Sequence, residues 1–196
     1  MGRPKVHDEK LRARLLDRAV SIVSAVGSDG LSLRTLARDC ETSTTAVYSL
    51  FGGKDALLTA LFDEAFRRLG ERLADVPPGT DALDAVVRTG VAYRDCALAE
   101  PHLFALMFSR PPALPPEAAA RTATGTALGP LRAAVGRAVD ERALRADTDP
   151  ATASLTLWTT VHGWVMLQLR GFLPPGSDGR FETTMRAVLQ GWRPAT

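Results

Sequence analysis

Cysteine is scarce in this chain of 196 residues, which contains only Cys40 and Cys96. Two cysteines make no disulfide framework and are typical of a reducing compartment, so we expect Cys40 to act as a small buried apolar residue. No apolar run approaches the roughly 20 residues that a membrane span needs, and the basic N-terminus runs into a charged pattern rather than the apolar stretch of a secretory signal. These absences predict a cytoplasmic protein with no membrane partner.

A strong charge of one sign is also missing, since 24 basic residues stand against 22 acidic ones. The basic excess is concentrated in residues 1–54, which carry nine basic and six acidic side chains, so an anion would bind at this end. His7, His102 and His162 lack metal-ligand spacing, Cys96 has no convincing catalytic partner, and no glycine-rich phosphate loop is present. We expect no enzyme, no catalytic residues, no metal and no cofactor.

No run in which apolar and polar residues alternate is long enough to predict a strand. Apolar residues recur instead at helical spacing along the chain. The first helix is expected to begin at Asp8, a plausible N-cap, and to end before Gly27. Further helices are expected over about 33–40, 43–51, 54–73, 81–100, 101–110, 117–144, 150–172 and 180–192. The predicted fold class is all-α.

The N-terminal quarter combines a long helix, a short helix, the turn ETS and a second short helix, which is the plan of a helix-turn-helix. The second short helix would read DNA, and Val47 and Phe51 would dock it on the core. Its other face carries small polar side chains and one tyrosine: Ser43, Thr44, Thr45, Tyr48 and Ser49. Such a face lets the backbone approach phosphates while hydroxyls reach base edges in the major groove.

Basic residues flank this unit at positions suited to phosphates. Arg34 lies near the start of the second helix, after the candidate N-cap Ser32, and Lys54 begins the fourth helix. Arg3 and Lys5, on an arm, would enter the minor groove or lie along the backbone. Each residue taken alone could instead be a helix cap, solvated surface or a disordered tail, but order, spacing and charge together favour DNA binding.

The same quarter of the chain resembles the N-terminal signature of the TetR family of bacterial transcriptional regulators. Matching positions hold Ser32, Arg34, Leu36, Ala37, Cys40, Ser43, Val47, Tyr48, Phe51, Lys54 and Leu57. The resemblance implies that Thr44, Thr45, Tyr48 and Lys54 touch double-stranded operator DNA.

Three residues depart from that signature. Glu41 stands where the family has a turn glycine, Thr42 replaces a valine and Leu50 replaces a histidine. If position 41 needs a left-handed backbone, a glutamate there costs up to ~1–2 kcal/mol and brings a negative charge near the phosphates.

The segment ASLTLWTTVHGWVMLQLRGFL is apolar on nearly every face, so it must be covered all round. We expect one face on its own core and another, with Leu157, Val161 and Trp164, against a second subunit. The last helix supplies a companion stripe: Phe181, Met185, Leu189 and Trp192. Two such helices from each subunit would form a four-helix homodimer interface, which is the dimerisation mode that the resemblance implies.

The pattern W-x-x-x-H-G, with Trp158, His162 and Gly163, looks like the WHG-type C-terminal domain of a subset of these regulators. Trp158 and His162 either line a ligand cavity, or Trp158 is core and His162 is a buried histidine held by a neighbour, which we favour for His162. Large side chains placed around an inducer cavity, or in an ordinary core, are Tyr93, Phe104, Met107 and Phe108, with Arg94 as a polar group.

We expect residues 1–53 to form a helix-turn-helix DNA-binding domain and residues 54–196 a helical bundle for ligand binding and dimerisation. The predicted function is a ligand-responsive repressor that binds a palindromic operator as a homodimer and is released by an unknown small-molecule inducer. Two alternatives remain, a helical small-molecule sensor and a protein-interaction module, neither of which binds DNA.

Overall fold

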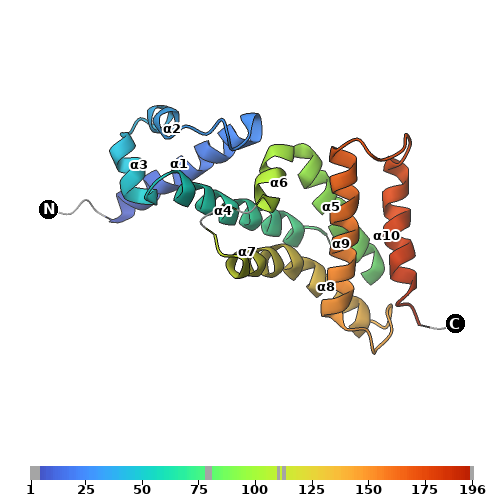
Figure 1. Ribbon diagram of the computed structural model, residues 1–196. Coiled ribbons are helices and arrows are strands. Elements are labelled where there is room, and N and C mark those ends of the chain that lie inside the picture. Colours follow the sequence, from blue (N-terminus) through green and yellow to red (C-terminus); the bar gives the residue numbers. More distant parts are fainter. Residues whose placement is uncertain (1–4, 78–80, 110, 112–113, 195–196) are drawn as a thin grey trace. The chain divides into compact units, whose positions relative to one another are not determined.

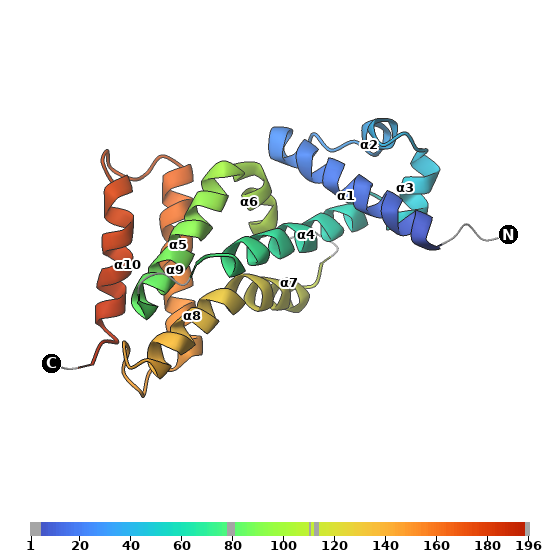
Figure 2. The same cartoon turned by 180° about the vertical axis from the view of Figure 1, so that it is seen from behind.

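The computed structural model describes residues 5–77, 81–109, 111 and 114–194, and only the backbone of residues 5–7, 127 and 178. Throughout these residues the regular structure is helical, with no strand among them (Figure 1 and, from behind, Figure 2). The prediction of an all-α fold is confirmed. Within the same described ranges, no helix combines the length and the apolar character that crossing a bilayer requires.

Contacts divide the chain into two compact units. The head unit comprises Met1–Phe66 and Glu100–Arg121, and the body unit comprises Arg67–Ala99 and Thr122–Thr196. Helix α4 (Lys54–Ala74) contributes residues to both units. Its first half belongs to the head because Phe66 packs edge-on against Phe108 of α6 (Pro101–Phe108), with ring centroids 5.7 Å apart.

The head unit begins with α1 (Lys5–Val26), α2 (Leu33–Asp39) and α3 (Thr44–Phe51). Helix α1 starts three residues before the predicted N-cap. Asp8 lies in its first turn, where the positive end of the helix dipole stabilises a carboxylate. The expected caps of the other two helices are present. Ser32 Oγ accepts from the Thr35 amide at 3.4 Å, and Ser43 Oγ accepts from the Ala46 amide at 3.1 Å.

Helix α6 packs against α1 inside the head unit. Two hydrogen bonds accompany this contact, both at the C-terminal end of α1. Ser24 Oγ donates to Glu100 Oε2 at 2.9 Å, and His102 Nδ1 lies 3.0 Å from the Ser24 carbonyl oxygen. The short helix α7 (Pro116–Thr122) completes this unit up to Arg121.

The body unit is built mainly from α5 (Ala82–Ala99), α8 (Leu128–Asp140), α9 (Pro150–Leu169) and α10 (Phe181–Gln190), which follows the short 3-10 helix η2 (Asp178–Arg180). Helix α5 contacts the other three, so it forms the centre of the bundle. Asp149 caps α9 by accepting from the amides of Ala151 and Thr152. The hydrogen bond from the Thr152 hydroxyl, together with those from the two amides, holds the pKa of Asp149 below its usual range.

The alanine-rich segment expected as one helix over 117–144 is interrupted. A π-helical turn, η1 (Ala123–Ala127), separates α7 from α8, which already ends at Asp140. The turn contains threonines and Gly125, which are weak helix formers. Helix α4 passes η1 closely, because a Cβ added at Gly70 would lie 2.9 Å from the Thr126 carbonyl oxygen and 2.7 Å from its Cγ2.

The turn between α2 and α3 requires a left-handed backbone at Glu41, whose φ is +52°. From the sequence we expect backbone strain if position 41, a glycine in the family signature, needs this conformation, and Glu41 does adopt it. Side chains other than glycine adopt it at a cost because their Cβ approaches the following carbonyl oxygen. Arg142, after α8, adopts φ +60° in the body unit.

We predict that Glu41→Gly stabilises the head unit by about 0.5–1 kcal/mol, since relief of the left-handed strain exceeds the entropy that glycine adds to the unfolded chain. Urea unfolding followed by circular dichroism measures the difference. Arg142→Gly is the matched substitution in the body unit. Glu41→Gln removes the charge and keeps the strain, so an equal gain with this variant would show that charge, not backbone strain, is responsible.

Candidate nucleic-acid interface and ligand cavity

Helix α3 presents one apolar and one polar face. Val47 and Phe51 are buried in the head unit, with 0% and 8% of their surface exposed, so they dock the helix as expected. Gly52 ends α3 in a left-handed conformation with φ +83°. The apolar spacing i, i+4 therefore fixes which side of α3 faces outward.

The outward side of α3 carries the side chains predicted to read DNA. Tyr48 is 56% exposed, a large fraction for an aromatic ring, and it lies over Gly53, with 3.7 Å between its Cε1 and a Cβ added there. The other residues predicted to contact DNA here are exposed as well: Ser32, Arg34, Ser43, Thr44, Thr45, Ser49 and Lys54. They make a polar, hydrogen-bonding surface with two cations.

The cations predicted to flank α3 differ in how far the structure describes them. Lys54 is the first residue of α4, where unpaired backbone amides add to its positive charge, and Arg34 is the second residue of α2. Lys5 begins α1, but only its backbone is described. Arg3 lies outside the described residues.

Three arginines of α1 form a brace, in that they contact α3 and the C-terminal end of α2. The Arg12 guanidinium lies over the Phe51 ring, 5.0 Å from its centroid. Arg14 Nη2 donates to the Cys40 carbonyl oxygen at 3.3 Å, and Arg18 Nη2 donates to Asp39 Oδ2 at 2.7 Å. These basic residues therefore hold α2 and α3 against α1.

Sequence reasoning counted these arginines only as positive charge. The signal that could have identified the brace is the helical phase of α1, since Arg14 and Arg18 lie one turn apart. Cys40 is buried as expected, and its Sγ donates toward the Arg14 carbonyl oxygen at 3.7 Å. Hydrogen bonds from Arg18 and Arg38 hold the pKa of the Asp39 carboxyl below its usual range.

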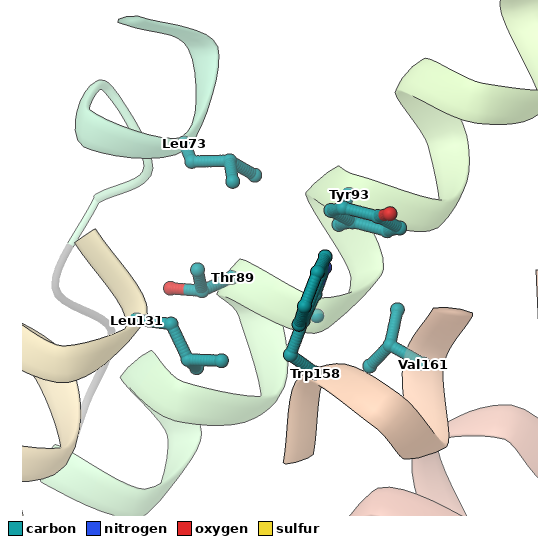
Figure 3. A pocket seen from close by; sticks show the side chains of 7 residues that line it. Leu73, Thr89, Tyr93, Leu131, Trp158 and Val161 are labelled. Atoms are coloured by element: carbon teal, nitrogen blue, oxygen red, sulfur yellow. The ribbon is translucent and has the colours of Figure 1, made fainter. Parts of the chain in front are cut away.

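The body unit contains a small apolar cavity among α4, α5, α8 and α9. Figure 3 shows the labelled side chains around it. The cavity is lined by Leu73, Thr89, Gly90, Tyr93, Leu131, Trp158 and Val161, and none of these residues is charged. Its volume is about 10 Å³, close to the room that a single water molecule needs.

Two of the seven residues predicted to bind a ligand, Tyr93 and Trp158, line this cavity, and His162 is next to them. The Tyr93 hydroxyl and His162 Nδ1 are hydrogen-bonded at 3.1 Å, so the histidine is held by a neighbour, as favoured from the sequence. Burial raises the pKa of Tyr93, and the Trp158 side chain offsets part of this shift. Burial lowers the pKa of His162, which favours the neutral ring at neutral pH.

The other four predicted ligand residues have different surroundings. Arg94 Nε donates to Gln168 Oε1 at 2.8 Å, and its guanidinium lies 5.4 Å from the centre of the Phe181 ring, so Arg94 ties α5 to α9 and α10. Phe104, Met107 and Phe108 belong to α6 in the head unit. The cavity of the body unit therefore does not include them.

Two family models match the chain. One, described as bacterial regulatory proteins of the tetR family, matches residues 15–61, and the other, described as a tetracyclin repressor-like C-terminal domain, matches residues 86–188, more than half of the chain. The chain belongs to the TetR family. The first model covers the helix-turn-helix, and the second covers the helices that form most of the cavity.

Relatives with curated names match over part of their length. An HTH-type transcriptional regulator of Mycobacterium tuberculosis is 28% identical over 57% of this chain and 49% of its own length. The HTH-type nicotine-responsive transcriptional repressor HdnoR of Paenarthrobacter nicotinovorans is 31% identical over 38% of this chain and 39% of its own length. This TetR-family chain thus spans about half the length, or less, of these two relatives.

A solved structure matches more completely. The structure of a protein of unknown function from Rhodococcus sp. RHA1 aligns with 94% of this chain and 96% of its own chain, at a TM-score of 0.80 and 28% identity. The two proteins therefore share their fold over nearly the whole chain.

The residues predicted for a dimer interface need correction. Within the TetR-family body unit of a single chain, five of the seven are at most 2% exposed: Leu157, Val161, Phe181, Met185 and Leu189. They fill the core between α5, α9 and α10, so a partner subunit cannot reach them. Trp164, which packs edge-on against Phe181, and Trp192 are half-buried.

The error lies in the choice of face on α9. The sequence correctly indicates a helix that is apolar all round, but it does not say which face meets the chain's own core. The apolar residues that stay exposed on α9 are Leu155, Leu167 and Leu169, at 49%, 46% and 36%.

We predict that Asp39→Asn lowers the melting temperature of the protein at pH 7, because it removes the carboxylate that Arg18 and Arg38 hold. Since the folded-state pKa is below the unfolded one, this contribution is present above the unfolded pKa of about 4 and is lost as the pH falls through the folded value. The wild type and the variant should therefore converge on acidification. Asp147→Asn, in the exposed pair with Arg145, is the control. A gap that stays constant with pH would contradict the prediction.

Proposed function

We propose that this TetR-family protein is a ligand-responsive transcriptional repressor. It binds a roughly palindromic operator as a homodimer, with two helix-turn-helix heads in major grooves about one helical turn, ~34 Å, apart. A small-molecule inducer that binds the body unit releases it from the DNA. Residues 1–53 carry the DNA contacts together with Lys54, the first residue of α4, and residues 54–196 carry ligand binding and dimerisation.

The observation that carries DNA binding is the division of α3 into two faces. Its apolar side is docked by Val47 and Phe51, and its polar side is open to solvent. We assign base contacts to Thr44, Thr45 and Tyr48 on this side. Phosphate contacts are assigned to Arg34 and Lys54, which lie at the starts of α2 and α4.

The release step is supported by the composition of α4. This continuous helix has Lys54 as its first residue and Leu73, a wall residue of the cavity, near its end. A ligand that moves Leu73 therefore moves the helix that also carries a proposed phosphate contact. Because the ligand binds one arrangement of α4 better than another, it shifts the population away from the DNA-binding state.

For the homodimer we propose the exposed side of α9 as the contact surface. Leu155, Leu167 and Leu169 lie there, and Phe172, just after the helix, is 73% exposed. A second copy of the chain would cover these apolar side chains, as the all-round apolar character of α9 requires.

We predict that Lys54→Ala weakens binding to every duplex and reduces the salt slope, the dependence of log K on log salt, by about 1, because one phosphate contact is lost. Tyr48→Ala should abolish enrichment of a two-fold symmetric site from a random duplex library. Fluorescence anisotropy over a salt series and library selection measure the two effects.

Arg137→Ala is the charge-matched control for this experiment, since Arg137 is an exposed cation of α8. It should leave both the slope and the selected site unchanged. If folded, dimeric wild-type protein enriches no sequence, DNA binding is refuted, and the sensor or protein-interaction function takes its place.

We predict that Leu155→Glu and Leu167→Glu convert the dimer to monomers, because each would bury a carboxylate at the proposed contact. Sedimentation velocity measures the state, and affinity for a two-fold symmetric site should fall at least about tenfold. Val26→Glu places the same charge on an apolar residue of the head unit that is 61% exposed. A dimer that survives both changes on α9 would exclude this surface.

A further inference from the structure

The Trp158 ring stands in the middle of the labelled side chains that line the cavity of the body unit. In Figure 3 it stands with Thr89 and Leu131 on one side and Tyr93 and Val161 on the other. The space left among these side chains is about 10 Å³, whereas a cavity that holds benzene measures roughly 150 Å³. An aromatic ligand can therefore enter only where a side chain leaves.

Trp158 is the side chain best able to leave. The other wall residues are almost fully buried, with exposed fractions of 2% for Val161, 3% for Leu73 and Tyr93, and 5% for Thr89 and Leu131. Trp158 is only half-buried, so it keeps a larger fraction of its surface exposed than any other wall residue. It is also the largest of the seven, and its departure opens a flat space of indole size.

The chemistry of the walls limits what can fill that space. No wall residue is charged. Arg88 and Arg94, which are next to wall residues along α5, contact Asp84 and Gln168 instead. Burial lowers the pKa of His162, which contacts Tyr93, and so disfavours its charged form. A ligand carboxylate or ammonium would lose its water without gaining a counter-charge.

A neutral ligand with a hydroxyl or an N–H group does have a partner. Tyr93 and His162 are hydrogen-bonded to each other, and the Tyr93 oxygen can accept a further hydrogen bond. The indole nitrogen of Trp158 is buried, and the Trp158 side chain opposes the rise that burial causes in the Tyr93 pKa. A donor on the incoming ring would take over this position.

We infer that the body-unit cavity binds a planar, uncharged aromatic molecule, which replaces the ring of Trp158 and donates a hydrogen bond to the Tyr93 hydroxyl. This inference rests on the proposed function, since it names the chemical class of the inducer. Without ligand, the indole of Trp158 fills the space that the ligand would take.

The first experiment follows Trp158 during binding. In a Trp164→Phe, Trp192→Phe background Trp158 is the sole tryptophan, and p-cresol, excited little at 295 nm, serves as the neutral probe. Its binding should shift the emission to longer wavelength as the ring moves into water, whereas the matched anion p-toluate should cause no shift. Equal binding of p-toluate, or p-cresol binding without a shift, would overturn the inference.

The second experiment removes the internal occupant. Trp158→Ala should bind indole at least about tenfold more tightly than wild type by calorimetry, because no ring has to be displaced. Trp192→Phe is the control and should bind indole as the wild type does. Unchanged indole affinity in folded Trp158→Ala would overturn the inference, and if that variant does not fold, the emission experiment decides.

Operator binding, measured on the same samples, distinguishes a failure of the inferred ligand class from a failure of the proposed repressor function. Protein that binds its selected DNA and ignores p-cresol and indole refutes the ligand class and leaves the regulator intact. Protein that binds the neutral probes and selects no DNA supports the cavity chemistry and refutes the repressor.

Discussion

The docking of α3 through Val47 and Phe51 is the constraint on which the proposed reading surface depends. Because these two apolar side chains are buried one turn apart, Thr44, Thr45 and Tyr48 face solvent. Arg12 stacks on Phe51, while Arg14 and Arg18 hold the end of α2. The polar face can therefore be rigid without using its own side chains for support, which keeps their hydrogen-bonding groups available for a ligand.

Helix α4 takes part in the packing of both compact units. Phe62 and Phe66 bury its first half in the head, and Leu73 places its second half at the cavity wall. Gly70 lets the helix pass within contact distance of the backbone of η1. Since larger residues would not fit at that contact, the position of α4 is fixed by a close backbone approach rather than by an adaptable side chain.

Much of the fold follows from local rules that the sequence displays. The caps at Ser32 and Ser43 and the left-handed strain at Glu41 depend on neighbours within a few residues or on a short motif. The π-helical turn and the arginine brace depend on contacts between distant segments. The face of α9 that meets the core is of this second kind, because an all-round apolar helix carries no periodicity that distinguishes core from subunit contact.

The filled cavity also restricts how a ligand can act. A site of about 10 Å³ has almost no affinity for an aromatic molecule, so binding must select an arrangement in which Trp158 and its neighbours have moved. The ligand would bind the opened arrangement and hardly bind the filled one. Nearly all of its binding free energy would then favour the opened arrangement, which is what an efficient switch requires. Leu73 on α4 is one of those neighbours. In the proposed mechanism Leu73 is therefore the wall residue through which a bound ligand would act on α4.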